Sequence, residues 1–261
     1  MKKRFEICRC AAPCLGIAAL FLCLALRLKG YDDNGLLRRG YFAAVLLPIV
    51  AAAGILLPIA AFWGMHPRGK YNRVFFASPI GAAGIACAGL GLLTDGILGI
   101  SGASGIHLAA AITGILAGLG LFWAAWCRYT GKRPTFLLFT LATVHLMLRL
   151  ICSYQPWSRQ SHVLPYLFPL LATVCIMFAL YQQTAADAGI GNLKSFLVTQ
   201  LAGLFLCIGA VGSDENWLFY LTMAAWLACT LASIQLPTPR AAEQPEQSEQ
   251  SEQSEQPEQG A

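Results

Sequence analysis

The stretch of residues 106–126, IHLAAAITGILAGLGLFWAAW, shows the pattern from which the fold of this chain can be predicted. It holds no Lys, Arg, Asp or Glu, and its length matches the roughly 20 residues that a helix needs to cross about 30 Å of hydrocarbon. A helix satisfies its own backbone hydrogen bonds in lipid, whereas an open sheet edge cannot. We expect seven more helices of this kind, over residues 11–26, 41–63, 78–96, 135–152, 163–181, 195–211 and 217–235.

The composition of the whole chain agrees with this interpretation. Of its 261 residues, 57% are hydrophobic and only 12% are charged, and the mean hydropathy is +0.59. A soluble domain has about 25% charged residues, so this chain could not cover its surface with polar groups in water. The sequence therefore predicts an all-α fold, a polytopic transmembrane helix bundle of about eight spans that has the lipid bilayer as a partner.

The formal net charge of +5 hides a division between two parts of the chain. Residues 1–236 hold 17 Lys and Arg against 7 Asp and Glu, whereas residues 237–261 hold one Arg and six Glu. The positive charge lies mostly in short loops beside the spans, where it is a signal of membrane topology. We therefore expect no nucleic-acid partner.

The same charges predict an orientation. With the N-terminus inside and eight spans, twelve Lys and Arg residues fall on the inner side and six on the outer side. Because cytoplasmic loops carry an excess of Lys and Arg, we expect a cytoplasmic membrane protein with both termini in the cytoplasm. The first outer loop departs from this pattern, since it holds Arg27, Lys29, Arg38 and Arg39.

The last part of the chain, residues 237–261, repeats Glu-Gln followed by Pro or Ser. Such a segment has too few apolar groups to offset the entropy of folding. We expect two parts in the chain: a helical membrane domain over residues 1–236 and a disordered tail over residues 237–261. The tail either serves only as a solvated end or, with the cytoplasmic loops, docks a protein partner.

The ten cysteines are not expected to form a disulfide framework, because most lie inside or at the ends of apolar spans, where they behave as small hydrophobic residues. Cys8, Cys10 and Cys14 cluster near the N-terminus, but no second group of ligands follows at a spacing typical of zinc sites. We expect no metal and no other cofactor.

Small residues recur along the third and fourth predicted helices. Ala83, Cys87 and Gly91 repeat every four residues, as do Gly84 and Ala88, and the next helix has Gly114 and Gly118. Small residues on one stripe allow helices to approach closely in a membrane. The pattern predicts that these two helices form a tightly packed hairpin.

Several ionisable side chains should lie near the outer ends of the spans. His145 and Arg149 are four residues apart and so share one face of the fifth helix, and Asp95 in the third helix is the obvious partner for Arg149. Because an isolated charge in the membrane costs at least ~2.5–3.5 kcal/mol, we expect this face to point into the bundle. The group is either a structural ion pair or a polar site for a solute, and the candidate residues are Asp95, His107, His145 and Arg149.

The tetrapeptide GASG, residues 102–105, opens the fourth predicted helix. It resembles the GxSG motif of rhomboid intramembrane serine proteases. That resemblance implies Ser104 as the nucleophile and His162, or else His145, as its base, which is a sensible pairing for nucleophilic catalysis. The chain departs from the family in three respects: Pro165 and Pro169 follow His162, the first loop is short, and the second helix has no His-x-x-x-Asn.

The segment PWSRQSHVLPYLFPLLATVCIMFALY, residues 156–181, gives the chain an overall look that resembles bacterial multi-span integral membrane proteins of unassigned function. This resemblance implies no activity. We keep three hypotheses: binding or transport of a small solute, a sensor or scaffold that acts through protein partners, and a rhomboid-like protease. Solute transport is the first of these and an enzyme is not the expected class.

Overall fold

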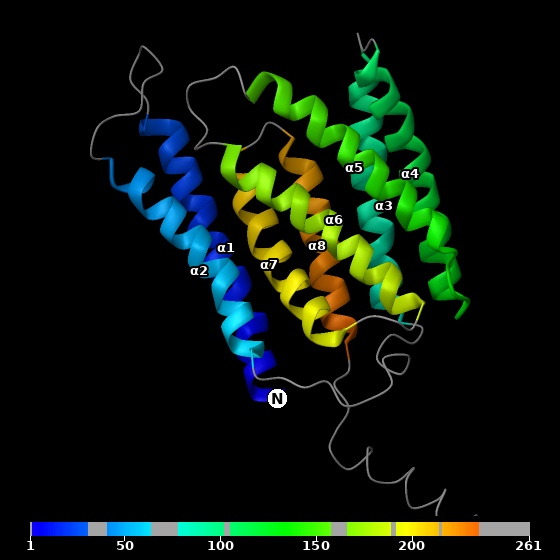
Figure 1. Cartoon of the computed structure of the whole chain (residues 1–261), viewed down its shortest axis with the longest axis horizontal. Coiled ribbons are helices and arrows are strands. Elements are labelled where there is room, and N and C mark those ends of the chain that lie inside the picture. The colour runs from blue at the N-terminus through cyan, green and yellow to red at the C-terminus, as the bar shows by residue number, and fades with distance from the viewer. Residues whose placement is uncertain are drawn as a thin grey trace, which may run out of the picture.

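The computed structural model of the chain describes residues 2–30, 41–63, 78–101, 105–157, 166–188, 192–213 and 216–234. Within these ranges the chain forms helices and no strands (Figure 1). The helices are α1 (Lys2–Lys29), α2 (Phe42–Phe62), α3 (Pro79–Ile100), α4 (Ile106–Tyr129), α5 (Phe136–Trp157), α6 (Leu167–Asp187), α7 (Leu193–Val211) and α8 (Trp217–Ser233). The prediction of an all-α bundle is confirmed.

The surface of the bundle is that of a membrane protein. Helices α1 to α7 are each long and apolar enough to cross a membrane, and α8 is an apolar helix of 17 residues. Large hydrophobic side chains such as Leu98, Leu119 and Trp123 are exposed on the outside, as expected of a lipid-facing surface. The chain is therefore a multi-pass membrane protein.

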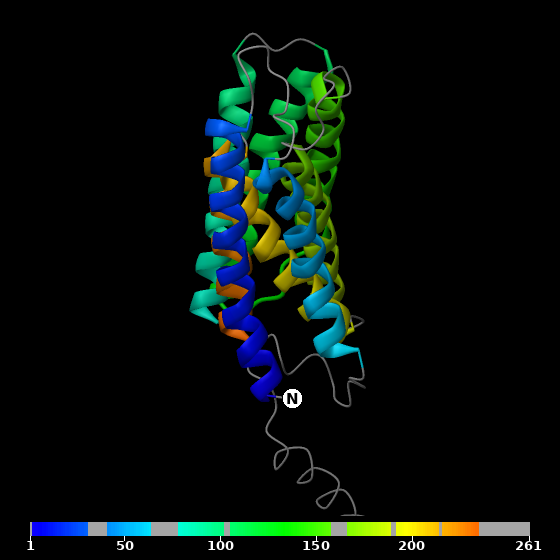
Figure 2. The ribbon, with the colours of Figure 1, turned by 90° about the vertical axis from the view of Figure 1, so that its left-hand side faces the viewer.

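Six of the helices form a closed circuit of contacts. Each helix from α3 to α7 packs against the next, and α8 packs against both α7 and α3. We call this arrangement the six-helix ring. Helices α1 and α2 form a hairpin that packs outside the ring against α7, as Figures 1 and 2 show.

Successive helices run in opposite directions, which gives the bundle two distinct ends. We call them the Asp95 end, at which α3 and α5 finish, and the Arg128 end, at which α4 and α6 finish. Helix α8 runs between them, because Phe219 lies against Arg149 and Ser233 lies beside Gly81 at the start of α3.

The α3–α4 hairpin is packed as tightly as predicted, and glycines allow it. A Cβ atom on Gly96 would lie 2.8 Å from the carbonyl oxygen of Ala111, and one on Gly118 would lie 2.8 Å from the carbonyl oxygen of Gly89. Backbone atoms cannot rotate away as side chains can, so these positions require glycine. Close approach through small residues is how helices associate in a membrane.

The prediction that all the small residues of α3 pack against α4 is nevertheless wrong in part. A Cβ atom on Gly91 would meet Thr222, and one on Gly84 would meet Cys229, both on α8. These two glycines therefore admit α8, while Gly89 and Gly96 admit α4. Because small residues lie all around α3, their spacing alone does not assign each stripe to its neighbour.

Three helix boundaries differ from the prediction in ways that matter below. Helix α1 starts at Lys2 and not at residue 11, α4 continues to Tyr129, and α6 continues to Asp187, six residues beyond its predicted end. The added segment of α6, QQTAAD, contains Gln and Ala, which are good helix formers. Prediction from apolar run length alone ends a helix where its polar residues begin.

Some predicted features lie outside the residues that the structure describes. Among them are the tail at residues 237–261, together with the boundary at 236/237, and Pro165 in the predicted span over residues 163–181. Among the other prolines of the predicted spans, Pro48 and Pro58 lie inside α2, and Pro169 lies in the first turn of α6.

Candidate functional site

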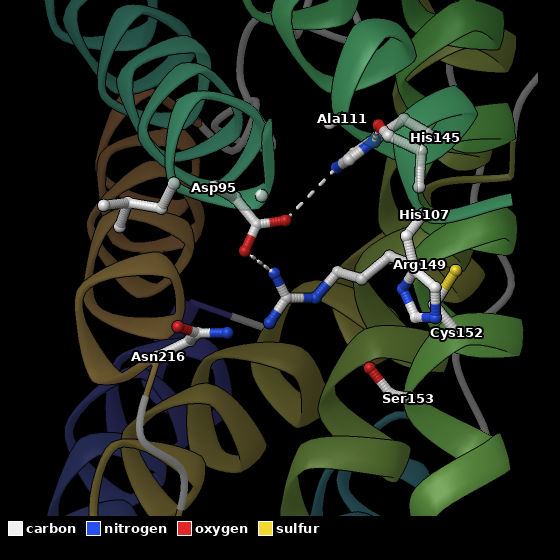
Figure 3. A pocket seen from close by; sticks show the side chains of 11 residues that line it. Asp95, His107, Ala111, His145, Arg149, Cys152, Ser153 and Asn216 are labelled. Carbon is white, nitrogen blue, oxygen red and sulfur yellow. Dashed lines mark hydrogen bonds and ion pairs between the residues drawn. The ribbon is translucent and has the colours of Figure 1, made fainter. Parts of the chain in front are cut away.

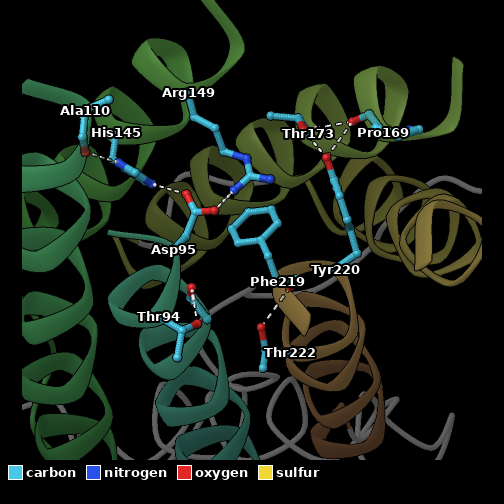
Figure 4. A network of polar contacts seen from close by, with 11 residues as sticks. Thr94, Asp95, Ala110, His145, Arg149, Pro169, Thr173, Phe219, Tyr220 and Thr222 are labelled. Carbon is cyan, nitrogen blue, oxygen red and sulfur yellow. Dashed lines mark hydrogen bonds and ion pairs between the residues drawn. The ribbon is translucent and has the colours of Figure 1, made fainter. Parts of the chain in front are cut away.

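A polar cluster lies inside the ring at the Asp95 end (Figure 4). Arg149 of α5 forms an ion pair with Asp95 of α3, in which Arg149 Nη1 donates to Asp95 Oδ1. The Arg149 side chain is only 8% exposed and that of Asp95 is 14% exposed. Helices α3 and α5 are separated by α4 in the ring, so the pair crosses the interior.

His145 completes this cluster from one turn deeper in α5. Its Nδ1 lies 3.0 Å from the carbonyl oxygen of Ala110 in α4. Because a carbonyl oxygen can only accept a hydrogen bond, Nδ1 carries the hydrogen. The other ring nitrogen, Nε2, lies 3.6 Å from Asp95 Oδ2. The carboxylate of Asp95 therefore lies between Arg149 on one side and His145 on the other.

Aromatic side chains of α8 hold the Arg149 guanidinium from another direction. Its Cζ lies 3.9 Å from the centroid of the Phe219 ring and 5.6 Å from that of Tyr220. A cation over an aromatic face is attracted by the ring quadrupole. Tyr220 in turn donates to the carbonyl oxygen of Pro169 in α6, over 3.4 Å. Arg149 is thus connected to α3 and α8 directly and to α6 through Tyr220.

This cluster forms one wall of a cavity of about 250 Å³ (Figure 3). Its polar lining comes from α3, α4, α5 and the turn before α8, and consists of Asp95, His107, His145, Arg149, Ser153 and Asn216. His107 is exposed in the first turn of α4, whereas His145 is almost fully buried. The cavity therefore leads from the surface to the buried carboxylate and guanidinium groups.

All four residues of the predicted polar group line this cavity: Asp95, His107, His145 and Arg149. The expected Asp95–Arg149 ion pair is confirmed by the geometry. A ligand-binding role for the four residues stays a prediction. The weaker alternative site cannot be placed, because Ser104 and His162 lie outside the described ranges.

A second buried ion pair, which was not predicted from the sequence, lies at the Arg128 end. Arg128 Nη2 of α4 donates to Asp187 Oδ1 of α6, and the two side chains are 8% and 10% exposed. The amide oxygen of Gln183, one turn before Asp187, accepts from both Arg128 Nη1 and Nη2 at 2.8 and 2.9 Å when the amide is oriented to satisfy both its atoms. This pair also crosses the ring interior, since α5 separates α4 from α6.

One sequence signal could have found the second pair. Gln183 and Asp187 are four residues apart and share a face if the sixth helix continues beyond Tyr181. Arg128, interpreted from the sequence as a topology signal in a loop, follows the apolar run of α4 by only two residues. Extending both helices by one or two turns brings the three side chains to the same end of the bundle.

The remaining candidate ligands and thiols can be placed in the parts of the chain that the structure describes. No group of three His, Cys, Asp or Glu side chains there could hold a metal ion. All ten cysteines are free thiols, which confirms that they form no disulfide framework.

Comparison of the chain with protein-family models, with curated proteins and with solved structures found no match. What the protein does must therefore be inferred from the two polar clusters and their place in the ring.

Proposed function

We propose that this protein binds a small solute in the cavity at the Asp95 end and carries it through the membrane. Support comes from one observation: the ionisable side chains of Asp95, His107, His145 and Arg149 line one cavity that leads to the surface. Ionisable residues inside a membrane are costly, and they commonly mark the pathway of a solute or an ion.

The charge balance of the cluster favours a particular class of solute. Asp95 and Arg149 neutralise each other, and removing one partner of a buried ion pair costs about 3–5 kcal/mol because the other charge is left uncompensated. A simple anion on Arg149 would displace Asp95 and leave such a charge. A zwitterion can place its anionic group on Arg149 and its cationic group on Asp95, so both charges remain paired.

The volume of the cavity is in keeping with a small molecule. Sites for drug-sized ligands have volumes of about 300–1,000 Å³, and this cavity has about 250 Å³. A compact α-amino acid, which carries a carboxylate and an ammonium group on one carbon atom, fits both the charge and the size. We therefore propose small zwitterions of this kind as the solute class.

The excess of positive charge at the Arg128 side supports a direction. Arg128, Lys132 and Arg133 follow one another closely there, and such residues favour the cytoplasmic side. On this proposal the protein lies in a cytoplasmic membrane, both termini are inside, and the cavity at the Asp95 end faces outward.

A thermal-shift measurement on the full chain in lipid nanodiscs tests the proposal. The panel contains the α-amino acids, each beside its N-acetyl and its amide derivative, which lack one of the two charges. At least one amino acid is expected to raise the midpoint temperature of unfolding, and neither of its two derivatives should raise it. His107→Ala, which changes an exposed residue at the cavity mouth, should weaken this shift.

Thr140→Val is the matched control, because the Thr140 hydroxyl donates to Phe136 O within the same helix and is remote from the cavity. It should leave the shift unchanged. The absence of any shift across the panel, or an equal shift from a derivative with one charge removed, would contradict the proposal.

A further inference from the structure

His145 has one ring nitrogen without a hydrogen-bond partner. The residue is 1% exposed, and its Nδ1–H donates to the carbonyl oxygen of Ala110 over 3.0 Å. In this tautomer Nε2 carries a lone pair and no hydrogen. Nε2 is buried and has no hydrogen-bond partner among the described residues. A buried polar atom without a partner calls for an explanation.

The atom that Nε2 faces is also a hydrogen-bond acceptor. Asp95 Oδ2 lies 3.6 Å from His145 Nε2 (Figures 3 and 4), and the other carboxylate oxygen, Oδ1, accepts from Arg149. Two acceptors cannot form a hydrogen bond with each other. One added proton would turn Nε2 into a donor and join the imidazolium to the carboxylate in a charge-assisted hydrogen bond.

The surroundings of the imidazole fix the direction of Nε2. A Cβ atom on Gly114 of α4 would lie 2.7 Å from His145 Cε1 and 3.1 Å from Nδ1, so the ring lies against α4 at a position where glycine leaves room for it. The hydrogen bond to the carbonyl oxygen of Ala110, one turn before Gly114, holds the same edge of the ring. His145 therefore presents Nε2 to Asp95.

The groups around His145 influence whether a proton resides on it. Asp95 of α3 favours the imidazolium, whereas burial and the positive charge of Arg149, one turn further along α5, disfavour it. Both His145 and Asp95 line the cavity, so water in the cavity can deliver and remove the proton. The other titratable side chains of the cluster and the cavity are His107 of α4, Cys152 of α5 and Tyr220 of α8, and α6 presents the carbonyl oxygen of Pro169.

A proton on His145 and the cationic group of a zwitterion compete for one carboxylate. While His145 is neutral, Asp95 and Arg149 balance each other, and the ammonium group of the proposed solute pairs with Asp95. Once His145 is protonated, the three side chains carry a net positive charge and Asp95 Oδ2 is already paired. An ammonium group placed there would also lie beside a like charge, which is unfavourable in a buried site.

We propose that His145 Nε2 and Asp95 Oδ2 form a proton-binding site, and that this proton exchanges with the zwitterion during transport. The inference rests on the proposed function and adds the coupling ion to it. The proton comes from water in the cavity and bonds to the Nε2 lone pair, and it returns to water when the ammonium group takes its place on Asp95. Because the cluster holds one of the two cations at a time, solute moving one way is coupled to protons moving the other way.

Nitrogen-15 NMR of the protein without solute tests the proton site. In the full chain in lipid nanodiscs, glutamine replaces His66, His107 and His162, so that His145 is the only histidine. At about pH 8, Nδ1 should carry a hydrogen and Nε2 should not, and Nε2 should become protonated as the pH falls to about 5, the range in which imidazoles change charge. An Nε2 that stays unprotonated over this range, or that carries the hydrogen in the neutral ring, would overturn the proposal.

Thermal shifts at two pH values test the exchange. The amino acid with the largest shift is titrated at about pH 8 and about pH 5, between which a free α-amino acid remains zwitterionic. Its apparent Kd should be several-fold higher at the lower pH in the unmodified protein, and should be equal at the two pH values in His145→Gln. His107→Gln is the control for the other histidine of the cavity, and its ratio of the two Kd values should match that of the unmodified protein.

Proteoliposomes measure the direction of coupling without any substitution. A pH-sensitive dye inside them reports the internal pH during uptake of the same amino acid. The internal pH should rise, because each solute molecule that enters is exchanged for a proton that leaves.

Three results would contradict the exchange: an equal Kd at the two pH values in the unmodified protein, a pH dependence that persists in His145→Gln, or uptake that leaves the internal pH unchanged or lowers it. Failure of the proposed function is distinct from these. In that case no amino acid gives a thermal shift at either pH, while the NMR titration still decides whether the proton site exists.

Discussion

The two ends of the six-helix ring hold the same pair of charged side chains in different surroundings. At the Asp95 end, the carboxylate lies between Arg149 and His145 beside a cavity, and aromatic rings cover the guanidinium. At the Arg128 end, the carboxylate of Asp187 contacts Arg128, whose guanidinium donates to the Gln183 amide. Each end thus holds an Asp–Arg ion pair, but the side chains that surround the pair differ between the two ends.

The two carboxylates differ in what remains beside them when the arginine is removed. Asp95 lines the cavity, which gives solvent access to its carboxylate. Asp187 depends chiefly on Arg128. The Asp95 end can therefore exchange its partners for a ligand, whereas the Arg128 end resists any change that leaves a charge alone.

The largest predicted effect follows from removing one charge at each end. Arg128→Leu leaves Asp187 without its cationic partner and should lower the free energy of unfolding by about 3–5 kcal/mol, the usual cost of breaking a buried pair. Arg149→Leu should cost less, because Asp95 lines the cavity and solvent there can hydrate the carboxylate that loses its partner. Unfolding of the two variants in nanodiscs, followed by denaturant titration, measures the difference.

The matching double variant is the control for this comparison. Arg128→Leu with Asp187→Leu removes both charges, and replacing a whole buried pair by apolar residues is often neutral or stabilising. The double variant should therefore be more stable than Arg128→Leu alone. An equal loss in Arg128→Leu and Arg149→Leu would show that the two pairs have equivalent surroundings.

The next effect concerns the hairpin that carries Asp95. Gly96→Ala places a methyl group 2.8 Å from both Ala111 O and Ile115 N, so α3 must move away from α4. Overpacking of this kind costs about 1–3 kcal/mol. The nearest atom to a Cβ on Gly120 is Leu138 Cδ2 at 3.4 Å, so Gly120→Ala should be tolerated. Thermal unfolding of both variants measures the contrast.

Much of this fold is predictable from the sequence because of the cost of polar groups in lipid. Apolar runs of about 20 residues predict the helices, and the i, i+4 spacing of His145 and Arg149, together with the depth of Asp95, predicts their convergence. Few acidic residues lie in or near the predicted spans, so Arg149 has few possible partners and Asp95 can be inferred as one.

The Arg128–Asp187 pair could not be predicted in the same way, for a physical reason. Charged residues at the end of a span can extend to the headgroups, pair with each other or belong to a loop, and all three alternatives share one sequence pattern. Arg128 follows Trp126 and Cys127 in a run that looks like any span end. Only the three-dimensional position of α6 across the ring from α4 separates the alternatives.

A smaller effect is expected from removing the aromatic ring of Phe219, which lies over the Arg149 guanidinium at the Asp95 end. Phe219→Leu keeps an apolar side chain but removes the ring that lies 3.9 Å from Arg149 Cζ. Cation–π contacts contribute about 0.5–2 kcal/mol, so the loss of stability should fall in that range. The test is a double-mutant cycle with Arg149→Leu: the effect of Phe219→Leu should shrink when the arginine is absent, and an unchanged effect would assign it to packing alone.

The smallest expected effects compare single hydrogen bonds at the two ends. Ser195→Ala removes the acceptor for Gln182 Nε2, a contact of 2.8 Å between α6 and α7 at the Arg128 end, and should cost about 0.5–1.5 kcal/mol. Tyr220→Phe removes the hydroxyl that reaches Pro169 O over 3.4 Å at the Asp95 end, and should cost less because long hydrogen bonds are weak. If thermal unfolding showed a larger loss of stability for Tyr220→Phe than for Ser195→Ala, the Tyr220 hydroxyl would connect α8 to α6 more strongly than expected of a 3.4 Å hydrogen bond. In that case the aromatic support of Arg149 would depend on this hydroxyl, and Tyr220→Phe should also weaken the response to zwitterions that Ser195→Ala leaves intact.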